Sequence, residues 1–124
     1  MQIPRFELLL LDSYNYFATS QFNLAVIIAN TALEIFIELY LKLILSKKYE
    51  GKQLKIQGKG LQNKVRKYFF HNRKHEELYN SNLLYRNFDY ARECRRKAVH
   101  HNKELERIDS LNTIKFILDF IEHL

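Results

Sequence analysis

The stretch YARECRRKAVHH, residues 90–101, places two adjacent arginines a few positions ahead of two adjacent histidines. Histidine is the side chain whose ordinary pKa suits proton transfer near neutral pH. Arginine brings a permanent charge and a planar fork of N–H donors that matches phosphate oxygens. Together they suffice for metal-independent RNA cleavage, in which a 2′-hydroxyl attacks the adjacent phosphate. Arg95 and His100 are the pair that we expect to carry this chemistry.

The helix that holds these residues decides whether they act together. Apolar spacing predicts a helix over residues 83–100, and on a helical wheel Arg95 lies about 20° from Leu84, on the apolar face. Burying an arginine there without a partner costs several kcal/mol. We expect either a salt bridge to Glu34 or Glu38, which would make Arg95 structural, or an anion supplied by a ligand.

The directions of the side chains restrict the site further. Arg96 lies about 40° from His100, one helical turn away and on the same side of the helix. Arg95 and His100 are about 140° apart on a continuous helix. They share a site only if the helix ends near Val99 or if a second chain brings its own copy of each.

The bare spacing of arginine, four residues and histidine is a weak signal, because so basic a chain matches it by chance. Two other pairs match it, Arg66 with His71 and Arg96 with His101. The histidines also lack a convincing metal-ligand spacing with acids. His71 and His75 are one helical turn apart, and a surface pair is the simpler interpretation. We therefore expect neither a metal nor another cofactor.

The periodicity of the whole chain is helical nearly throughout. It predicts an all-α, compact up-and-down bundle of four to five helices, in one domain over residues 1–124. We expect Ser20 to cap the second helix and Ser110 to cap the last one. The expected helices cover residues 4–19, 21–46, 61–70, 83–100 and 111–124.

The same spacing predicts which side chains face inward. In the first helix these are Leu8, Leu11, Phe17 and Ala18. In the last helix they are Leu111, Ile114, Ile117, Leu118, Ile121 and Leu124. The second helix is apolar around most of its circumference, so it lies centrally in the bundle or faces a partner chain. Its one polar stripe consists of Asn30, Glu34, Glu38 and Lys42.

The charge is strongly basic and unevenly placed. The formal net charge is +6 and the pI is near 9.4. Between positions 42 and 74 there are eleven lysines and arginines against one acid, which favours contact with polyanions such as RNA. The alternative is that these cations serve solubility alone. All three glycines lie in residues 47–60, which we expect to form a mobile loop that binds RNA phosphates through Lys52, Lys55 and Lys59.

Cysteine content and hydropathy bear on the compartment. Cys94 is the only cysteine, so no disulfide forms within the chain, and a reducing, cytoplasmic location is expected. The first residues show neither a basic region nor a cleavage site typical of a secretory signal. The apolar residues 24–45 are interrupted by Glu34, Glu38 and Lys42, which are costly in lipid. We expect a buried helix there and no membrane contact.

These features together resemble the HEPN superfamily (higher eukaryotes and prokaryotes nucleotide-binding). Its members are compact α-bundles with a long apolar second helix that carries an acid, here TALEIFIELYLK. An Arg-x(4 to 6)-His motif ends their penultimate major helix, and RRKAVH at residues 95–100 fills that position. The resemblance covers the whole chain except the loop at 47–60. It implies a homodimeric endoribonuclease, often a toxin or a phage-defence component, with the Arg–His pairs of both chains in one cleft.

The resemblance also implies roles for single residues. Arg95 would hold the scissile phosphate, His100 would act as general acid or base, and Glu34 would orient Arg95. Arg96 and His101 would be auxiliary. In the branch paired with a nucleotidyltransferase antitoxin, a tyrosine that receives AMP stands where this chain has Asn102. Asn102 therefore places membership of that branch, and regulation by tyrosine modification at this position, in doubt. An antitoxin or nucleotidyltransferase partner stays an expectation. The alternative hypothesis is a non-catalytic HEPN-like module that binds nucleotide, RNA or a partner protein.

Overall fold

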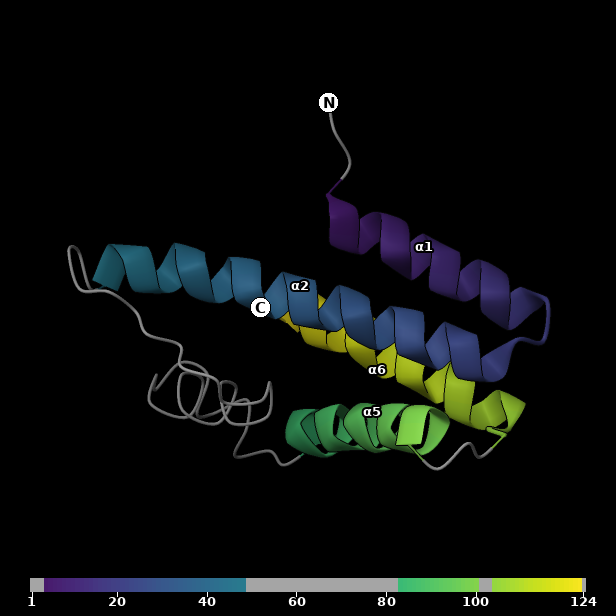
Figure 1. Ribbon diagram of the computed structural model, residues 1–124. Helices are drawn as coiled ribbons and strands as arrows, with labels where there is room; N and C mark the ends of the chain where they lie inside the picture. The colour runs from purple at the N-terminus through teal and green to yellow at the C-terminus, as the bar shows by residue number, and fades with distance from the viewer. Residues whose placement is uncertain (1–3, 49–82, 101–103, 124) are drawn as a thin grey trace.

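The computed structural model describes residues 4–48, 83–100 and 104–123, and these form four helices without a strand (Figure 1). The helices are α1 (Arg5–Ala18), α2 (Phe22–Lys48), α5 (Leu83–His100) and α6 (Arg107–His123). The prediction of an all-α bundle is confirmed. The third expected helix, residues 61–70, lies outside the described residues. So does most of the expected loop at 47–60, although Lys47 and Lys48 still belong to α2.

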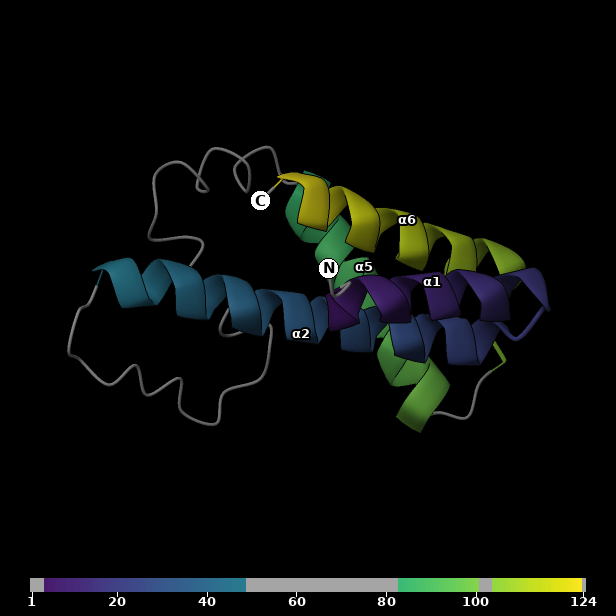
Figure 2. The ribbon, with the colours of Figure 1, turned by 90° about the horizontal axis from the view of Figure 1, so that it is seen from above.

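Helix α2 lies at the centre of the arrangement and contacts the other three helices. Its first half is covered by α1 and α6, while α5 crosses it at a steep angle (Figures 1 and 2). Its C-terminal part extends beyond the ends of the other helices, where Leu39 and Leu43 are exposed. The central position predicted for this helix is confirmed for its N-terminal half.

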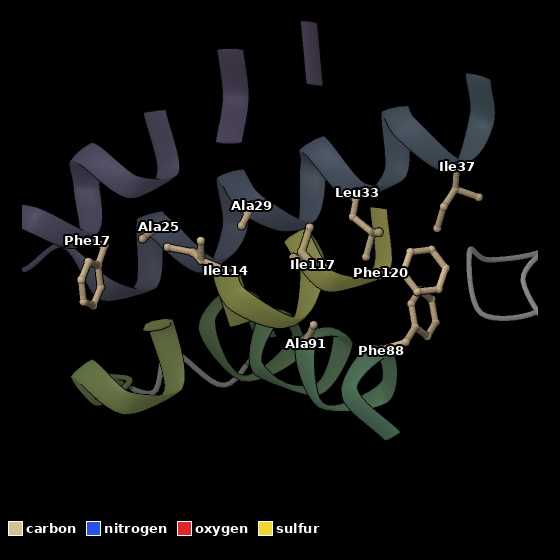
Figure 3. Packing of buried hydrophobic residues seen from close by; sticks show 10 residues of the cluster. All are labelled: Phe17, Ala25, Ala29, Leu33, Ile37, Phe88, Ala91, Ile114, Ile117 and Phe120. Carbon is tan, nitrogen blue, oxygen red and sulfur yellow. The ribbon is translucent and has the colours of Figure 1, made fainter. Parts of the chain in front are cut away.

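The core is formed where α2 meets α5 and α6 (Figure 3). Ala25, Ala29, Leu33 and Ile37 recur every four residues along α2 and are fully buried, as one stripe of a 3.6-residue helix requires. The alanines in this stripe allow the neighbouring helices to approach α2 closely. Facing this stripe are Phe88 and Ala91 of α5 and Ile114, Ile117 and Phe120 of α6.

The turn between α1 and α2 differs from the expected cap at Ser20. Ser20 adopts a left-handed backbone conformation, with φ 63°, and its N–H bonds the Phe17 carbonyl at 3.0 Å. The N–H of Gln21 bonds the Tyr16 carbonyl at 2.9 Å, which completes a Schellman termination of α1. The Gln21 carbonyl then accepts the N–H of Ala25, so Gln21 is the N-cap residue directly before α2. Ser20 ends one helix and does not start the next.

The inward face of α1 was predicted partly wrongly. Leu8 and Leu11 are 46% and 59% exposed, and Ala18 is also exposed. Four consecutive leucines at positions 8–11 surround the helix, so their spacing does not select one face. Phe17 is buried as predicted, and fully buried Ser13 lies one turn before it, bonding the Leu10 carbonyl at 2.8 Å.

Helix α6 begins earlier than expected, and this changes the role of Ser110. The Glu106 carbonyl accepts the N–H of Asp109 at 3.1 Å, while the Asp109 carboxylate accepts the N–H of Glu106 at 3.3 Å. This exchange resembles a capping box and starts the helix at Arg107. Ser110 is therefore inside the helix and fully buried, and its hydroxyl has no hydrogen-bond partner within the described residues.

The buried face of α6 also differs from the predicted one, because it is turned around the helix axis. Ile114 and Ile117 are buried as expected, while Leu111 and Leu118 are 40% and 41% exposed. Phe120, absent from the predicted stripe, fills the core beside Phe88 with ring centroids 5.6 Å apart. The large aromatic ring takes the inward position that spacing alone assigned to leucine. Leu124 lies outside the described residues.

Within the part of the chain that the structure describes, one helical stretch, Phe22–Tyr40, is long and apolar enough to cross a membrane by length and composition. In the structure its buried residues pack against α1, α5 and α6. The core of the bundle thus accounts for its most apolar face without a lipid environment. The absence of membrane contact stays a prediction.

Candidate functional site

Helix α5 carries most of the candidate site, and its buried face sets the direction of every side chain on it. Phe88, Ala91 and Cys94 are at most 3% exposed and define that face. On the helical wheel Arg95 lies about 40° from Ala91, between Ala91 and Phe88, but near the C-terminal end of α5 it is only partly covered by the neighbouring helices. Its side chain is 33% exposed. The expected burial of Arg95 is therefore only partial.

Glu34 of α2 meets two arginines of α5, and the nearer one is not Arg95. The Arg92 guanidinium donates Nη1 to Glu34 Oε1 at 2.8 Å, with the Arg92 side chain only 16% exposed. Arg95 Nε lies 3.7 Å from the same oxygen. The predicted pairing of Arg95 with Glu34 is present but longer than a hydrogen bond. Arg92 was not among the expected site residues.

Asn30 of α2 also contacts Arg92 and so supports its pairing with Glu34. It is fully buried one helical turn before Glu34, and its amide nitrogen donates to the carbonyls of Val26 at 3.0 Å and Ala91 at 3.1 Å. Its Oδ1 lies 3.4 Å from Arg92 Nη1, which completes a polar connection between α2 and α5. Asn30 and Glu34 thus hold Arg92 at two points along α2.

A surface hollow of about 250 Å³ lies beside this network. Its lining includes three arginines and a histidine, a set that can receive an anion and exchange a proton with it. His100 is exposed at the last position of α5, and Arg96 is exposed and paired with Glu93 three residues earlier. The lining residues are Arg92, Glu93, Arg95, Arg96 and His100.

The charges around the hollow do not cancel. Within the described residues, Arg92 is paired with Glu34 and Arg96 with Glu93. Arg95 has only its longer contact with Glu34, whose nearer oxygen already accepts from Arg92. One guanidinium charge beside the hollow is therefore largely uncompensated, and a singly charged anion such as a phosphodiester would balance it.

Arg95 and His100 were expected to share a site only if the helix ended near Val99 or if a second chain brought its own copy of each. Helix α5 ends at His100, the residue directly after Val99, so the first of these conditions is met. Both side chains line the same hollow, which one chain forms alone. Of the other expected site residues, Arg96 lies there too and Glu34 lies behind Arg95. The remaining ones are outside the described residues: His101, Asn102, Lys52, Lys55 and Lys59.

Metal ligands do not gather in the described part of the chain. No group of three or more histidine, cysteine or acidic side chains is close enough there to hold an ion. Four of the five histidines, at positions 71, 75, 101 and 123, have no described side-chain environment, so the expectation of a metal-free site stays a prediction.

A second polar cluster joins α5 to the start of α6. The Tyr90 hydroxyl donates to Asp109 Oδ1 at 2.7 Å, and burial together with this bond raises the pKa of Tyr90. Burial also raises the pKa of the Cys94 thiol, which hydrogen-bonds Thr113 and Tyr90. Both groups are thus held in their neutral forms. A buried thiol kept protonated is a poor nucleophile, so this cluster is structural and not part of the reaction site.

Sequence reasoning missed Arg92 and the role of Asn30, although a signal for both existed. The polar stripe of the second helix was recognised, with Asn30 and Glu34 one turn apart. Arg92 and Arg95 are also one turn apart, and such a pair can face that stripe when two helices cross. The spacing along one helix does not show which of these two arginines lies nearer to Glu34, and Arg92 was therefore left unconsidered.

Comparison with family models, with curated proteins and with solved structures finds no match to this chain.

Proposed function

We propose that this protein is a metal-independent endoribonuclease of the HEPN type, acting at the hollow on α5. The observation that carries the proposal is the lining of that hollow, in which Arg95 retains an uncompensated charge beside His100. A phosphodiester needs such a charge in the ground state and more of it as the pentavalent transition state forms. Histidine supplies the proton transfers near neutral pH.

The reaction follows from these two groups. Arg95 binds a nonbridging oxygen of the scissile phosphate, and His100 acts on one side of the phosphorus as base or acid. The 2′-oxygen forms a bond to phosphorus while the bond to the 5′-oxygen breaks. The proton of the 2′-hydroxyl passes to the base, and the departing 5′-oxygen takes a proton from the acid. Arg96, His101 and Asn102 are auxiliary in this proposal.

Two proton transfers need two groups, which favours a homodimer with α5 near the two-fold axis. A second copy would bring another His100 to the opposite side of the phosphate, since a two-fold axis places equivalent residues face to face. Exposed Val99, beside His100, is an apolar residue available to such an interface. We propose a cytoplasmic toxin or phage-defence component that acts on RNA, with an antitoxin or nucleotidyltransferase as a further partner.

A non-catalytic module that binds RNA, nucleotide or a partner protein is the second candidate. One observation favours it. His100 is exposed, and no hydrogen bond within the described residues orients its imidazole. Catalytic histidines are commonly held in place by a third group. In this alternative the arginines bind an anion without chemistry, and no dimer is needed.

The test is an RNA cleavage assay with and without EDTA. The proposal expects products that end in a 2′,3′-cyclic phosphate, a rate unaffected by EDTA, and loss of cleavage in His100→Ala. His71→Ala is the matched control, because His71 has the same spacing after an arginine in another segment. Binding of RNA without cleavage by the wild-type protein would instead support the non-catalytic module.

A further inference from the structure

The guanidinium of Arg92 is held by two side chains of α2. Nη1 donates to Glu34 Oε1 at 2.8 Å and lies 3.4 Å from Asn30 Oδ1. Asn30 cannot move away, because it is fully buried and bonded to backbone carbonyls of both α2 and α5. Arg92 is therefore the most constrained of the three arginines at the hollow.

Arg95 is more exposed than Arg92 and has a weaker contact with Glu34. Its side chain is about twice as exposed, at 33% against 16%, and within the described residues its guanidinium makes no hydrogen bond. Its Nε is 3.7 Å from the Glu34 oxygen that Arg92 already occupies. An Arg–carboxylate pair is strongest when it is bidentate and short. Glu34 thus forms a short pair with Arg92 and only a longer contact with Arg95.

We propose that Arg92 is a positioning residue, which holds Glu34 so that the fork of Arg95 stays open to a phosphodiester. The proposal rests on the function proposed above, since it concerns the same hollow. Without Arg92, the Glu34 carboxylate turns to Arg95 and closes its guanidinium in a direct ion pair. Glu34 then competes with the substrate phosphate for the same donors. The resemblance to the HEPN superfamily implies that Glu34 orients Arg95. In this proposal Arg92 instead holds Glu34 away from a direct ion pair with Arg95.

Anion binding provides a test that does not depend on cleavage. The probe is a dinucleoside monophosphate with a 2′-deoxy sugar, which carries a phosphodiester and lacks the attacking hydroxyl. NMR titration of the full-length protein measures its Kd from the Nε–Hε resonance of Arg95. Arg92→Ala is expected to weaken binding about tenfold, the scale of one charge-assisted hydrogen bond. Arg86→Ala, an exposed arginine on the same helix, is the matched control and should bind as the wild type does.

The double variant separates positioning from direct contact. In Arg92→Ala/Glu34→Gln the competing carboxylate is gone, so binding should return to within about threefold of the wild type. If Arg92 touched the phosphate itself, or only stabilised the fold, the second substitution would not restore affinity. A double variant as weak as Arg92→Ala, or an unaffected Arg92→Ala, overturns the proposal. If Arg92→Ala does not fold, Arg92→Gln keeps an N–H donor for Asn30, loses the charge and is tested in its place.

The resonance of Arg95 in the ligand-free protein distinguishes this proposal from the proposed function. Closure of Glu34 onto Arg95 should shift the Hε signal downfield in the variant at position 92, and the double variant should reverse that shift. A wild-type protein that binds no probe contradicts a phosphodiester site in the hollow. The positioning role is then supported by this shift alone, or overturned by its absence.

Discussion

Asn30 is a buried amide that connects two helices through three polar contacts. Its nitrogen donates to one carbonyl on each helix, and its oxygen faces Arg92. Removing a buried group with several hydrogen bonds costs more than removing an exposed one, because the partners lose their bonds and a cavity remains. The amide therefore fixes the register of α2 against α5, and with it the position of Arg92 beside Glu34.

We predict that Asn30→Ala lowers the free energy of unfolding by about 2 kcal/mol, whereas a surface change leaves it within about 0.5 kcal/mol. Urea denaturation monitored by circular dichroism measures both values. Asn15→Ala, on the exposed side of α1, is the control. Equal stability of the two variants would mean that Asn30 does not hold the helices together.

At residue scale, the sequence identified residues that lie together better than it identified the ion pairs they form. Arg95, Arg96 and His100 were selected from type and spacing, and all three line one hollow. Arg92, the nearer partner of Glu34, was not predicted. The choice between Arg92 and Arg95 depends on how far the two helices are rotated against each other. That rotation is set by the buried residues of α2 and α5, through packing that one helical wheel does not represent.

At the scale of elements, the start of α6 depends on a contact from another helix. Asp109 receives both the N–H of Glu106 and the hydroxyl of Tyr90. The pKa of Tyr90 is raised above its ordinary value of 10.0, first by burial and then by this hydrogen bond. The folded protein thus retains the tyrosine proton where the unfolded chain has lost it. Its contribution to stability is present below pH 10.0 and lost as the pH rises above that value.

We predict that Tyr90→Phe lowers the free energy of unfolding at neutral pH by about 1 kcal/mol, through loss of the Asp109 hydrogen bond. The difference from the wild type should narrow as the pH rises above 10.0, because phenylalanine has no proton to lose. Denaturant titrations at neutral and at strongly alkaline pH measure it. Tyr14→Phe, on the exposed side of α1, should show no such narrowing. A difference that is constant with pH would contradict the raised pKa.

Local patterns in the sequence predict where the helices lie, but they do not predict which residues cap the helix starts. Periodicity located α1, α2 and α5 to within a few residues. The two serine caps were wrong, since Ser20 is held by the Schellman bonds of the preceding helix and Ser110 by burial against the bundle. A serine suits a helix start in isolation, but neighbouring backbone groups and packing decide which residue takes that position.

At the scale of the whole molecule, the positive charge is concentrated away from the hollow in sequence. Lys52, Lys55 and Lys59 belong to the segment expected to bind RNA phosphates. Phosphate contacts release counterions, so each one steepens the fall of affinity with salt. The structure bears on the hollow alone, because those lysines lie outside the described residues. The basic composition predicted a polyanion partner, whereas the pairing of Arg92 with Glu34 required the crossing of α2 and α5.

We predict that changing these three lysines to glutamine weakens RNA binding and reduces the salt slope of log K by about 2. Fluorescence anisotropy over a range of salt concentrations measures the slope. A matched control changes Arg5, Lys42 and Lys115 to glutamine, which removes the same charge from exposed positions on α1, α2 and α6. Equal slopes for the two triple variants would show that the effect is one of net charge and not of this segment.

The most direct test of the whole account is single-turnover RNA cleavage by variants at the hollow. Arg95→Ala and His100→Ala should each lower the rate by at least ~100-fold, the scale of losing one transition-state contact or one acid–base group. Arg66→Ala and His71→Ala, with the same spacing elsewhere in the sequence, should cleave at nearly the wild-type rate. Denaturation curves ensure that all four variants are folded. A folded His100→Ala protein that cleaves RNA as fast as the wild type would contradict the account.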